Sequence, residues 1–395
     1  MIASVTVVGA SLAGLGTARA LRDQGFDGRV TVVGSEVHRP YDRPPLSKEF
    51  LAGTMARDEL DLLSPEDEPL GVDWRLARTA VRLDPGGRSV WLDDGEPIAS
   101  DAVVIATGSR ARRLPGPPLA GVHTLRTVDD ATALRAELVP GARLVLVGAG
   151  FIGAEIASTA AGLGVEVTVT EALATPLAGP LGVELGRVCA GLHGDHGVRL
   201  VAGVGVAELV GERRVSAVRL ADGRELPADV VVVGIGARPC VDWLAGSGLA
   251  LAPDGGVATD ARCATAVPGV LAVGDCAAAH RDWAGGPLRL EHWTNALTQP
   301  NTAAATLLGR DDPLPPDHEA PYFWSDQYGH RLQFAGHRRD GDLVEVVEGD
   351  VDAREFLAVY RRGDQPVAVL GMNQPRQFTR WRRRLAARAT TTATV

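Results

Sequence analysis

The sequence predicts an α/β fold with two nested Rossmann-like dinucleotide-binding units. The order strand, glycine-rich turn, helix, strand and acidic residue occurs in the first 36 residues and occurs again in residues 143–171. Further apolar strands lie after each unit, which indicates that the second unit interrupts the first. One glycine-rich turn opens many α/β helices, whereas two complete units that each end in an acid form a specific signal.

The first unit starts with the apolar strand SVTVVG at residues 4–9. The turn GASLAG carries Gly9 and Gly14, and Ser11 stands where the middle glycine of the usual pattern is expected. A helix pattern and a second strand, GRVTVVGSE, follow, and that strand ends in Glu36. Backbone N–H groups of such a turn bind a pyrophosphate, and the acid accepts hydrogen bonds from ribose hydroxyls.

The second unit has the complete glycine pattern, GAGFIG, with Gly148, Gly150 and Gly153. Its second strand, VEVTVTE, ends in Glu171. A carboxylate at this place accepts a ribose 2′-hydroxyl and repels a 2′-phosphate, and no arginine follows it closely. The second site is therefore predicted to prefer NADH over NADPH.

Three further strands are expected to be buried: residues 101–109 lie between the two units, and residues 228–239 and 269–277 follow the second unit. The first two, DAVVIATGS and ADVVVVGIGARP, are expected where the chain crosses between the nested domains. The third, GVLAVGDCA, places Asp275 at the carboxyl end of a strand, where ligands of such sheets are usually held. The alternative is that Asp275 only caps the next helix.

Composition excludes several classes of protein. Hydrophobic residues make up 45% and charged residues 23%, as in ordinary globular proteins, and no apolar run approaches the ~20 residues of a membrane span. The chain enters a strand pattern at once, which argues against a signal peptide. The net charge of −9 argues against nucleic acid as the main partner.

The four cysteines form no CxxC pair, so no zinc or iron–sulfur site is expected on this chain, and no other metal site is predicted. We expect reduced thiols and a cytoplasmic location. The four cysteines are Cys189, Cys240, Cys263 and Cys276.

Lys48 is the single lysine of the chain, since the other 39 of the 40 basic residues are arginines. Codon bias with one random remainder is the simple explanation. The chemical alternative is that this position needs a compact ammonium, because the planar guanidinium of arginine is too broad for some sites.

Together these motifs resemble the FAD-dependent, NADH-using ferredoxin reductases of oxygenase systems, within the glutathione reductase-type flavoproteins. The resemblance covers the whole chain and is most specific at RPYDRPPLSKEF, EHWTNA and PYFWSDQYG (residues 39–50, 291–296 and 321–329). It implies an FAD domain at residues 1–112 and 240–315. It also implies an inserted NADH domain at 113–239, and an α+β C-terminal domain at 316–395 that shields the flavin and faces the redox partner.

The resemblance also implies the residues of both cofactor sites. FAD would be held by Gly9, Ser11, Gly14, Glu36, Arg43, Lys48, Thr107, Gly108, Asp275 and Trp293. NADH would be held by Gly148, Gly150, Gly153, Glu155, Glu171 and Gly236. Pro300 departs from the pattern: a proline has no N–H, so no cofactor contact is assigned to that backbone.

The resemblance places Lys48 beside the flavin N5, paired with Glu155, and names these two residues as catalytic. Relatives that reduce disulfides carry redox cysteines near this position, and the stretch around Lys48 has none. Electrons must therefore leave by another route, and flavin converts a two-electron hydride into single electrons. Trp293 and Trp324 are candidates for the flavin edge, with core packing as the alternative.

The expected function is electron transfer from NADH through FAD to an acidic [2Fe–2S] or other small ferredoxin that serves a cytochrome P450 or a ring-hydroxylating dioxygenase. Alternatives are a rubredoxin reductase and an NADH-sensing interaction protein like apoptosis-inducing factor. An arginine-rich C-terminal segment is a candidate docking surface, with a solvated helix face as the alternative. The candidate docking residues are Arg376, Arg380, Arg382, Arg383 and Arg384.

Overall fold

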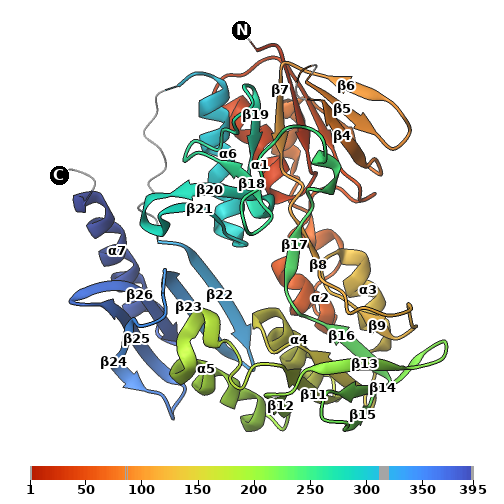
Figure 1. Ribbon diagram of the computed structural model, residues 1–395, viewed down its shortest axis with the longest axis vertical. Helices are drawn as coiled ribbons and strands as arrows, with labels where there is room; N and C mark the ends of the chain where they lie inside the picture. The colour runs from red at the N-terminus through yellow and green to blue at the C-terminus, as the bar shows by residue number, and fades with distance from the viewer. Residues whose placement is uncertain (1, 85, 87, 311–319, 393–395) are drawn as a thin grey trace.

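The computed structural model describes residues 2–84, 86, 88–310 and 320–392. Figure 1 shows two parts that each consist of a parallel sheet with helices, here called the first and the second layer, and a narrow crossing joins them. The first layer contains strands β1 (Ser4–Val8) and β2 (Arg29–Val33), and the second contains β10 (Arg143–Val147) and β11 (Glu166–Glu171). A third, antiparallel sheet lies beside the second layer. Within the described residues, no helix is long and apolar enough to cross a membrane.

The first sheet is parallel throughout and has the strand order β19-β7-β1-β2-β3. The inner strands are mainly apolar and almost fully buried, as expected for a covered parallel sheet, whereas the edge strand β3 alternates between partly buried and exposed residues. The bounds of the strands are β1 (Ser4–Val8), β2 (Arg29–Val33), β3 (Val72–Arg75), β7 (Ala102–Ile105) and β19 (Val270–Ala272). Strand β19 returns from far along the chain, which confirms that the first unit is interrupted.

Helices α1 (Leu12–Asp23) and α6 (Trp293–Leu307) pack against each other beside this sheet (Figure 1). Pro300 lies buried inside α6, at the place where the two helices approach each other closely. A Cβ atom at Gly16 of α1 would lie 3.1 Å from the Pro300 Cγ atom, so the proline ring fills the space that the glycine leaves.

The second sheet has the order β12-β11-β10-β16-β9 and is also parallel. The Val-rich strands β10 and β16 form its buried centre. The strands are β9 (Val122–His123), β10 (Arg143–Val147), β11 (Glu166–Glu171), β12 (Arg199–Ala202) and β16 (Val230–Val233); the helices are α3 (Val128–Glu137), α4 (Phe151–Gly162) and α5 (Ala178–Asp195).

Two short strands join the layers. Strand β8 (Ser109–Ala111) leaves the first sheet, and β17 (Ala237–Pro239) returns from the second, and they pair as an antiparallel ribbon. Three smaller sheets have three strands each. The first consists of β4 (Ala80–Asp84), β5 (Ser89–Leu92) and β6 (Pro97–Ala99), and the second of β13 (Val206–Gly211), β14 (Val215–Leu220) and β15 (Glu225–Pro227). The third consists of β18 (Val257–Thr259), β20 (Ala277–Arg281) and β21 (Gly286–Arg289).

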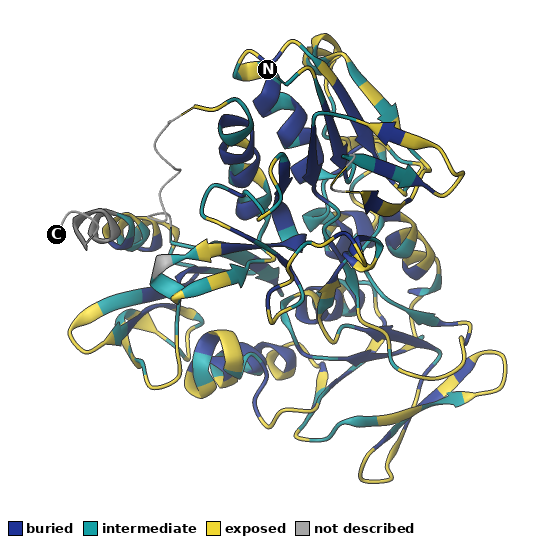
Figure 2. Ribbon diagram, turned by 45° about the horizontal axis from the view of Figure 1, so that its top comes forward, coloured by how far each residue is buried: buried dark blue, intermediate teal, exposed yellow. Residues whose placement is uncertain are grey.

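The C-terminal part is a five-stranded antiparallel sheet with the order β22-β23-β26-β25-β24, followed by α7 (Pro375–Thr392). Its strands are β22 (Tyr322–Gln327), β23 (His330–Gly336), β24 (Leu343–Asp350), β25 (Glu355–Arg362) and β26 (Gln365–Met372). Apolar residues of α5 and of this sheet form one buried cluster, so the sheet is fastened to the second layer. In Figure 2 the first parallel sheet and the helices beside it are largely dark blue, whereas the outer hairpins are largely yellow.

The segment that contains Lys48 packs against helices α3 and α4 of the second layer. A 3₁₀ helix (Pro44–Ser47) runs into the short helix α2 (Glu49–Ala52), and Lys48 lies at their junction with φ −124° and ψ −108°. The proline at the start favours the first turn. The hydroxyl of Thr159 in α4 donates to the Ser47 carbonyl at 2.8 Å, which ties the segment to the second layer.

Candidate dinucleotide and electron-transfer site

The first glycine turn brings strand β1, helix α1 and strand β7 into close contact. Gly9 has φ +127°, and a Cβ atom there would lie 2.0 Å from the Ala106 carbonyl oxygen. A Cβ atom at Gly14 would lie 1.8 Å from the Gly9 carbonyl oxygen. Ser11, which replaces the expected middle glycine, is the N-cap residue of α1. The two glycines thus let the chain turn tightly from β1 into α1, so the N-terminus of α1 lies at the carboxyl end of β1, where an anion can bind.

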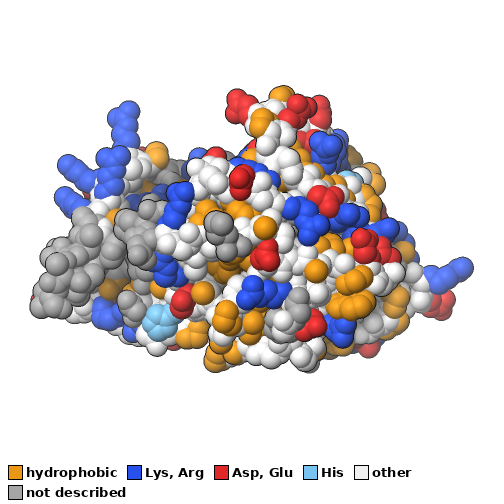
Figure 3. Space-filling model, turned by 90° about the horizontal axis from the view of Figure 1, so that it is seen from above, with side chains coloured by type: hydrophobic (Ala, Val, Ile, Leu, Met, Phe, Trp, Pro, Cys, Tyr) orange, Lys and Arg blue, Asp and Glu red, His pale blue; other side chains and the backbone are white. Residues whose placement is uncertain are grey.

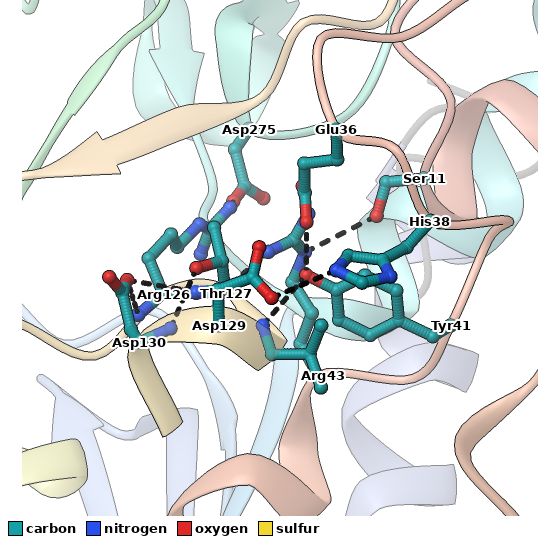
Figure 4. A network of polar contacts seen from close by, with 11 residues as sticks. Ser11, Glu36, His38, Tyr41, Arg43, Arg126, Thr127, Asp129, Asp130 and Asp275 are labelled. Atoms are coloured by element: carbon teal, nitrogen blue, oxygen red, sulfur yellow. Dashed lines mark hydrogen bonds and ion pairs between the residues drawn. The ribbon is translucent and has the colours of Figure 1, made fainter. Parts of the chain in front are cut away.

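Glu36 and Arg43 meet beside this turn (Figure 4). The guanidinium of Arg43 donates to Glu36 Oε1 at 2.7 Å and to Ser11 Oγ at 3.3 Å, while the Tyr41 hydroxyl donates to Glu36 Oε2. Burial raises the pKa of Tyr41, which keeps its hydroxyl protonated and able to donate. Tyr41 is a partner of Glu36 that sequence reasoning missed.

Asp275 lies at the same edge, on the turn after β19 (Figure 4). Its Oδ2 atom accepts hydrogen bonds from the Arg126 guanidinium at 2.6 Å and from the Ser109 hydroxyl at 3.1 Å. Arg126 precedes α3, and its carbonyl accepts from Arg43. Sequence reasoning missed Arg126, because nothing in its local sequence indicates a contact with a residue almost 150 positions away.

Thr107, Gly108 and Gly236 lie at the crossing between the two layers. The Thr107 hydroxyl donates to the Cys240 carbonyl at 2.7 Å, and the Arg112 N–H donates to the Gly236 carbonyl at 2.9 Å. Gly108 and Gly236 have φ of +64° and +93°, a backbone region that glycine favours. These residues therefore shape the crossing; cofactor contacts of their own stay a prediction.

The second glycine turn repeats the geometry of the first. A Cβ atom at Gly148 would lie 2.3 Å from the Gly234 carbonyl oxygen, and one at Gly153 would lie 2.4 Å from the Gly148 carbonyl oxygen. Gly150 differs, because a Cβ atom there has no heavy atom within 4 Å. Gly148 and Gly153 therefore allow close backbone packing, whereas Gly150 keeps open the space in front of the α4 N-terminus.

Glu171 is the last residue of β11 and lies next to this turn. Its Oε2 atom accepts from the Ala149 N–H at 3.0 Å, and its Oε1 atom accepts from the Leu173 N–H at 2.9 Å. The acid that the sequence places 23 residues after Gly148 is thus anchored beside the glycine turn.

Lys48 and Glu155 form an ion pair, as predicted: the distance from Nζ to Oε2 is 2.7 Å. The ammonium also donates to the Pro44 carbonyl at 3.0 Å. The carboxylate accepts two further hydrogen bonds, from Ser47 Oγ to Oε2 at 2.5 Å and from Ser325 Oγ to Oε1 at 2.6 Å. Glu155 is 5% exposed, so these donors replace water around a buried charge. Sequence reasoning missed both serines.

Trp293 and Trp324 lie against each other at the start of α6 and in β22. Their ring centroids are 5.8 Å apart in an edge-to-face arrangement, and Tyr322 stacks on Trp324 at 5.9 Å. The indole N–H of Trp293 donates to Asp42 Oδ1 at 2.9 Å, which fixes the ring beside the Lys48 segment. Both tryptophans therefore join the first layer to the C-terminal sheet, and their place at a flavin edge stays a prediction.

His292 is a further polar residue that the sequence did not single out. Burial lowers the pKa of His292 to about 4, so its imidazole is neutral at pH 7. Its Nδ1 atom has no hydrogen-bond partner among the described residues, and its ring lies 5.3 Å from that of Phe323. Phe323 also contacts Phe151 of α4 at 4.7 Å, so the aromatic cluster spans all three parts of the molecule.

The cysteine side chains are not among the contacts described above. The four thiols form no disulfide, and burial is the main cause that raises the pKa of each thiol. Over the described ranges, no cluster of three or more His, Cys, Asp or Glu side chains is arranged to hold a metal ion.

Two glycine turns with anchored acids, and a buried Lys–Glu pair between them, define an oxidoreductase with two dinucleotide-binding domains. Comparison with known proteins gives the family. Residues 3–299 match the model described as pyridine nucleotide-disulphide oxidoreductase, and residues 322–395 match the one described as reductase C-terminal. The chain belongs to the pyridine nucleotide-disulphide oxidoreductase family, and the resemblance to ferredoxin reductases stated above is confirmed.

Individual relatives cover almost the whole chain. The ferredoxin–NAD(+) reductase component of the biphenyl dioxygenase system of Paraburkholderia xenovorans is 40% identical over 96% of this chain and 92% of that protein. Putidaredoxin reductase of Pseudomonas putida is 34% identical over 95% and 90%. Among solved structures, the covalent putidaredoxin reductase–putidaredoxin complex matches with a TM-score of 0.92 and 32% identity, covering 98% of this chain and 93% of that one.

Proposed function

We propose that this chain is an NADH-dependent ferredoxin reductase that supplies single electrons to an oxygenase system. The observation that carries the proposal is the Lys48–Glu155 pair, which lies between two dinucleotide turns where disulfide-reducing relatives would need cysteines. The relatives support it, because they include reductase components of dioxygenase systems and putidaredoxin reductase.

The residues at the first turn fit FAD. N–H groups at the α1 N-terminus and the cations Arg43 and Arg126 suit a pyrophosphate, while Glu36 and Asp275 are acceptors for sugar hydroxyls. When bound, FAD accepts a hydride and gives up electrons singly. We propose that these residues, with Gly9, Ser11 and Gly14 of the turn, hold it.

The second turn fits NADH. Gly150 leaves open space at the α4 N-terminus, and Glu171 lies beside it. We propose that Gly148 and Gly153 form this turn and that Glu171 binds the ribose 2′-hydroxyl. Between the turns, the Lys48 ammonium would stabilise negative charge that develops at the reacting end of a bound flavin, while Glu155 keeps the cation in place.

The domain boundaries are part of this proposal. We place the inserted NADH domain at residues 113–239 and the two FAD segments at 1–112 and 240–315. The paired strands β8 and β17, which end at Ala111 and Pro239, support the crossing points. The junction at 315/316 lies outside the described residues.

An acceptor screen tests the proposed function. The purified protein with bound FAD is mixed with NADH and, one at a time, a [2Fe–2S] ferredoxin, other iron–sulfur ferredoxins, rubredoxin and dioxygen. We expect fast reduction of an acidic [2Fe–2S] ferredoxin. A preference for rubredoxin would favour the rubredoxin reductase alternative. Slow turnover with every acceptor would favour the alternative of an NADH-sensing interaction protein.

The cytoplasmic location expected from the reduced thiols stays a prediction.

Discrimination between nicotinamide cofactors gives one prediction. We expect kcat/KM to be at least about tenfold higher for NADH than for NADPH, which corresponds to about 1.4 kcal/mol. Glu171→Gln removes the negative charge that repels a 2′-phosphate. We expect this variant to have a lower ratio of kcat/KM for NADH to kcat/KM for NADPH. The matched control is Glu166→Gln at the other, exposed end of β11. Equal kcat/KM values for both cofactors in the unmodified enzyme would contradict the prediction.

The arginines of α7 give a second prediction about the partner. Arg376, Arg380, Arg383 and Arg384 are exposed, while the Arg382 guanidinium lies 4.3 Å from the centroid of the Tyr322 ring. Basic side chains stand out on the side of the molecule where the C-terminal part lies (Figure 3). We propose that this face of α7 attracts an acidic ferredoxin.

Arg380→Glu combined with Arg383→Glu is expected to raise the KM for ferredoxin about tenfold at low salt and much less at high salt, since ions screen exposed charges. The control is Arg199→Glu, an exposed charge reversal at the start of β12. Steady-state kinetics across a salt series measure both. A KM that is independent of salt in the unmodified enzyme would exclude electrostatic docking.

A further inference from the structure

Side chains from all three parts of the molecule meet at Glu155. The carboxylate comes from α4 of the second layer, Ser47 and Lys48 come from the segment between β2 and β3 of the first layer, and Ser325 comes from β22 of the C-terminal sheet. Each carboxylate oxygen has its own donors: Oε2 accepts from Ser47 and Lys48, and Oε1 accepts from Ser325.

The bond from Ser325 is buried and directional. Ser325 is 0% exposed and Glu155 is 5% exposed, so no bulk water replaces a donor that is lost. The Ser325 hydroxyl in turn accepts from the Gln327 side-chain amide at 3.0 Å, which leaves its own proton for Glu155. The orientation of the hydroxyl is therefore fixed by a second residue of the same strand.

Strand geometry connects this bond to the tryptophan pair. Neighbouring residues of a strand point to opposite faces. Trp324 accordingly packs against Trp293 of the first layer, while Ser325 points to Glu155 of the second. One strand, β22, thus contacts both sides of the predicted reaction centre.

We propose that Ser325 is a positioning residue: it holds the Glu155 carboxylate from the C-terminal sheet and so sets the place of the Lys48 ammonium. The inference rests on the proposed function, because it concerns the same Lys48 site. It assigns to the C-terminal domain a part in the reduction step, in addition to shielding and partner contact. Without the Ser325 donor, the carboxylate turns toward other donors and the ammonium moves with it.

The single lysine makes this displacement measurable. Protein grown on isotopically labelled lysine carries one labelled side chain, Lys48, and gives one side-chain signal in an NMR spectrum. With FAD bound and no ferredoxin present, we expect a signal distinct from that of free lysine. In Ser325→Ala the signal is expected to move toward the free-lysine position. Stopped-flow reduction of the FAD by NADH is expected to slow about tenfold.

Ser158→Ala is the matched control. The Ser158 hydroxyl lies on the same helix as Glu155 and accepts from the Tyr328 N–H at 2.7 Å, so this variant also removes a bond between α4 and the C-terminal part. It does not touch the carboxylate, and we expect the Lys48 signal to stay in place. Ser325→Thr keeps the hydroxyl and is expected to retain the original signal and rate.

An unchanged Lys48 signal in Ser325→Ala would overturn the inference, and so would an equal change in Ser158→Ala or in Ser325→Thr. The test is separate from that of the proposed function, because the signal needs no acceptor. If no ferredoxin is reduced but the signal moves, the proposed function fails and the role of Ser325 stands. If ferredoxin is reduced and the signal does not move, only the role of Ser325 fails.

Discussion

Lys48→Ala is expected to slow the reduction of bound FAD by NADH by about 10- to 100-fold while the flavin content of the protein stays the same. The reason is electrostatic: one preorganised donor at the place where charge develops contributes a large share of rate acceleration. Lys48 donates to Glu155, the Pro44 carbonyl and Ser47 Oγ, so its loss leaves the proposed FAD-holding residues of the first glycine turn in place. Stopped-flow absorbance at the flavin band measures the rate.

Lys48→Arg is expected to be impaired as well, because the planar guanidinium does not fit the position of an ammonium that is held by Glu155, Ser47 and Pro44. Arg331→Ala serves as the control, since it removes a cation that pairs with Asp326 at the exposed end of the C-terminal sheet. A normal reduction rate in Lys48→Ala would leave codon bias as the better explanation of the single lysine.

The second large effect is expected at Gly9. Alanine there places a Cβ atom 2.0 Å from the Ala106 carbonyl oxygen and must hold φ near +127°, so β1, α1 or β7 has to shift. We expect Gly9→Ala to lower the free energy of unfolding by about 3 kcal/mol or more and to yield protein without FAD. Urea unfolding and the flavin-to-protein absorbance ratio measure these two effects.

Gly150→Ala is the matched comparison at the second turn. The backbone there has φ −74°, and an added Cβ atom meets no heavy atom within 4 Å. We expect unfolding like that of the unmodified protein and full FAD content, but a Kd for NADH raised about tenfold or more, because the methyl group occupies space that the pyrophosphate needs. Similar loss of stability in both variants would contradict the different roles of these two glycines.

The sequence predicted the two dinucleotide-binding units because their signals are local. Gly9 and Gly148 occupy positive-φ turns at strand ends, and the acids Glu36 and Glu171 follow at the ends of the next strands. A strand–turn–helix–strand unit has fixed dimensions, so the spacing of a few residue types is enough to predict it. The family resemblance extended these units to the whole chain and named the Lys48–Glu155 contact.

The tertiary structure alone decided which donors reach Glu155, Asp275 and Glu36. Ser325, Arg126 and Tyr41 are ordinary residues in their own segments, and each acquires a role only where distant elements pack together. The sequence by itself thus determined the fold class, the two turns and their acids, since backbone geometry relates residues close in the chain. It did not determine the donors around Glu155 and Asp275, because the approach of remote helices and strands depends on side-chain packing across the whole molecule.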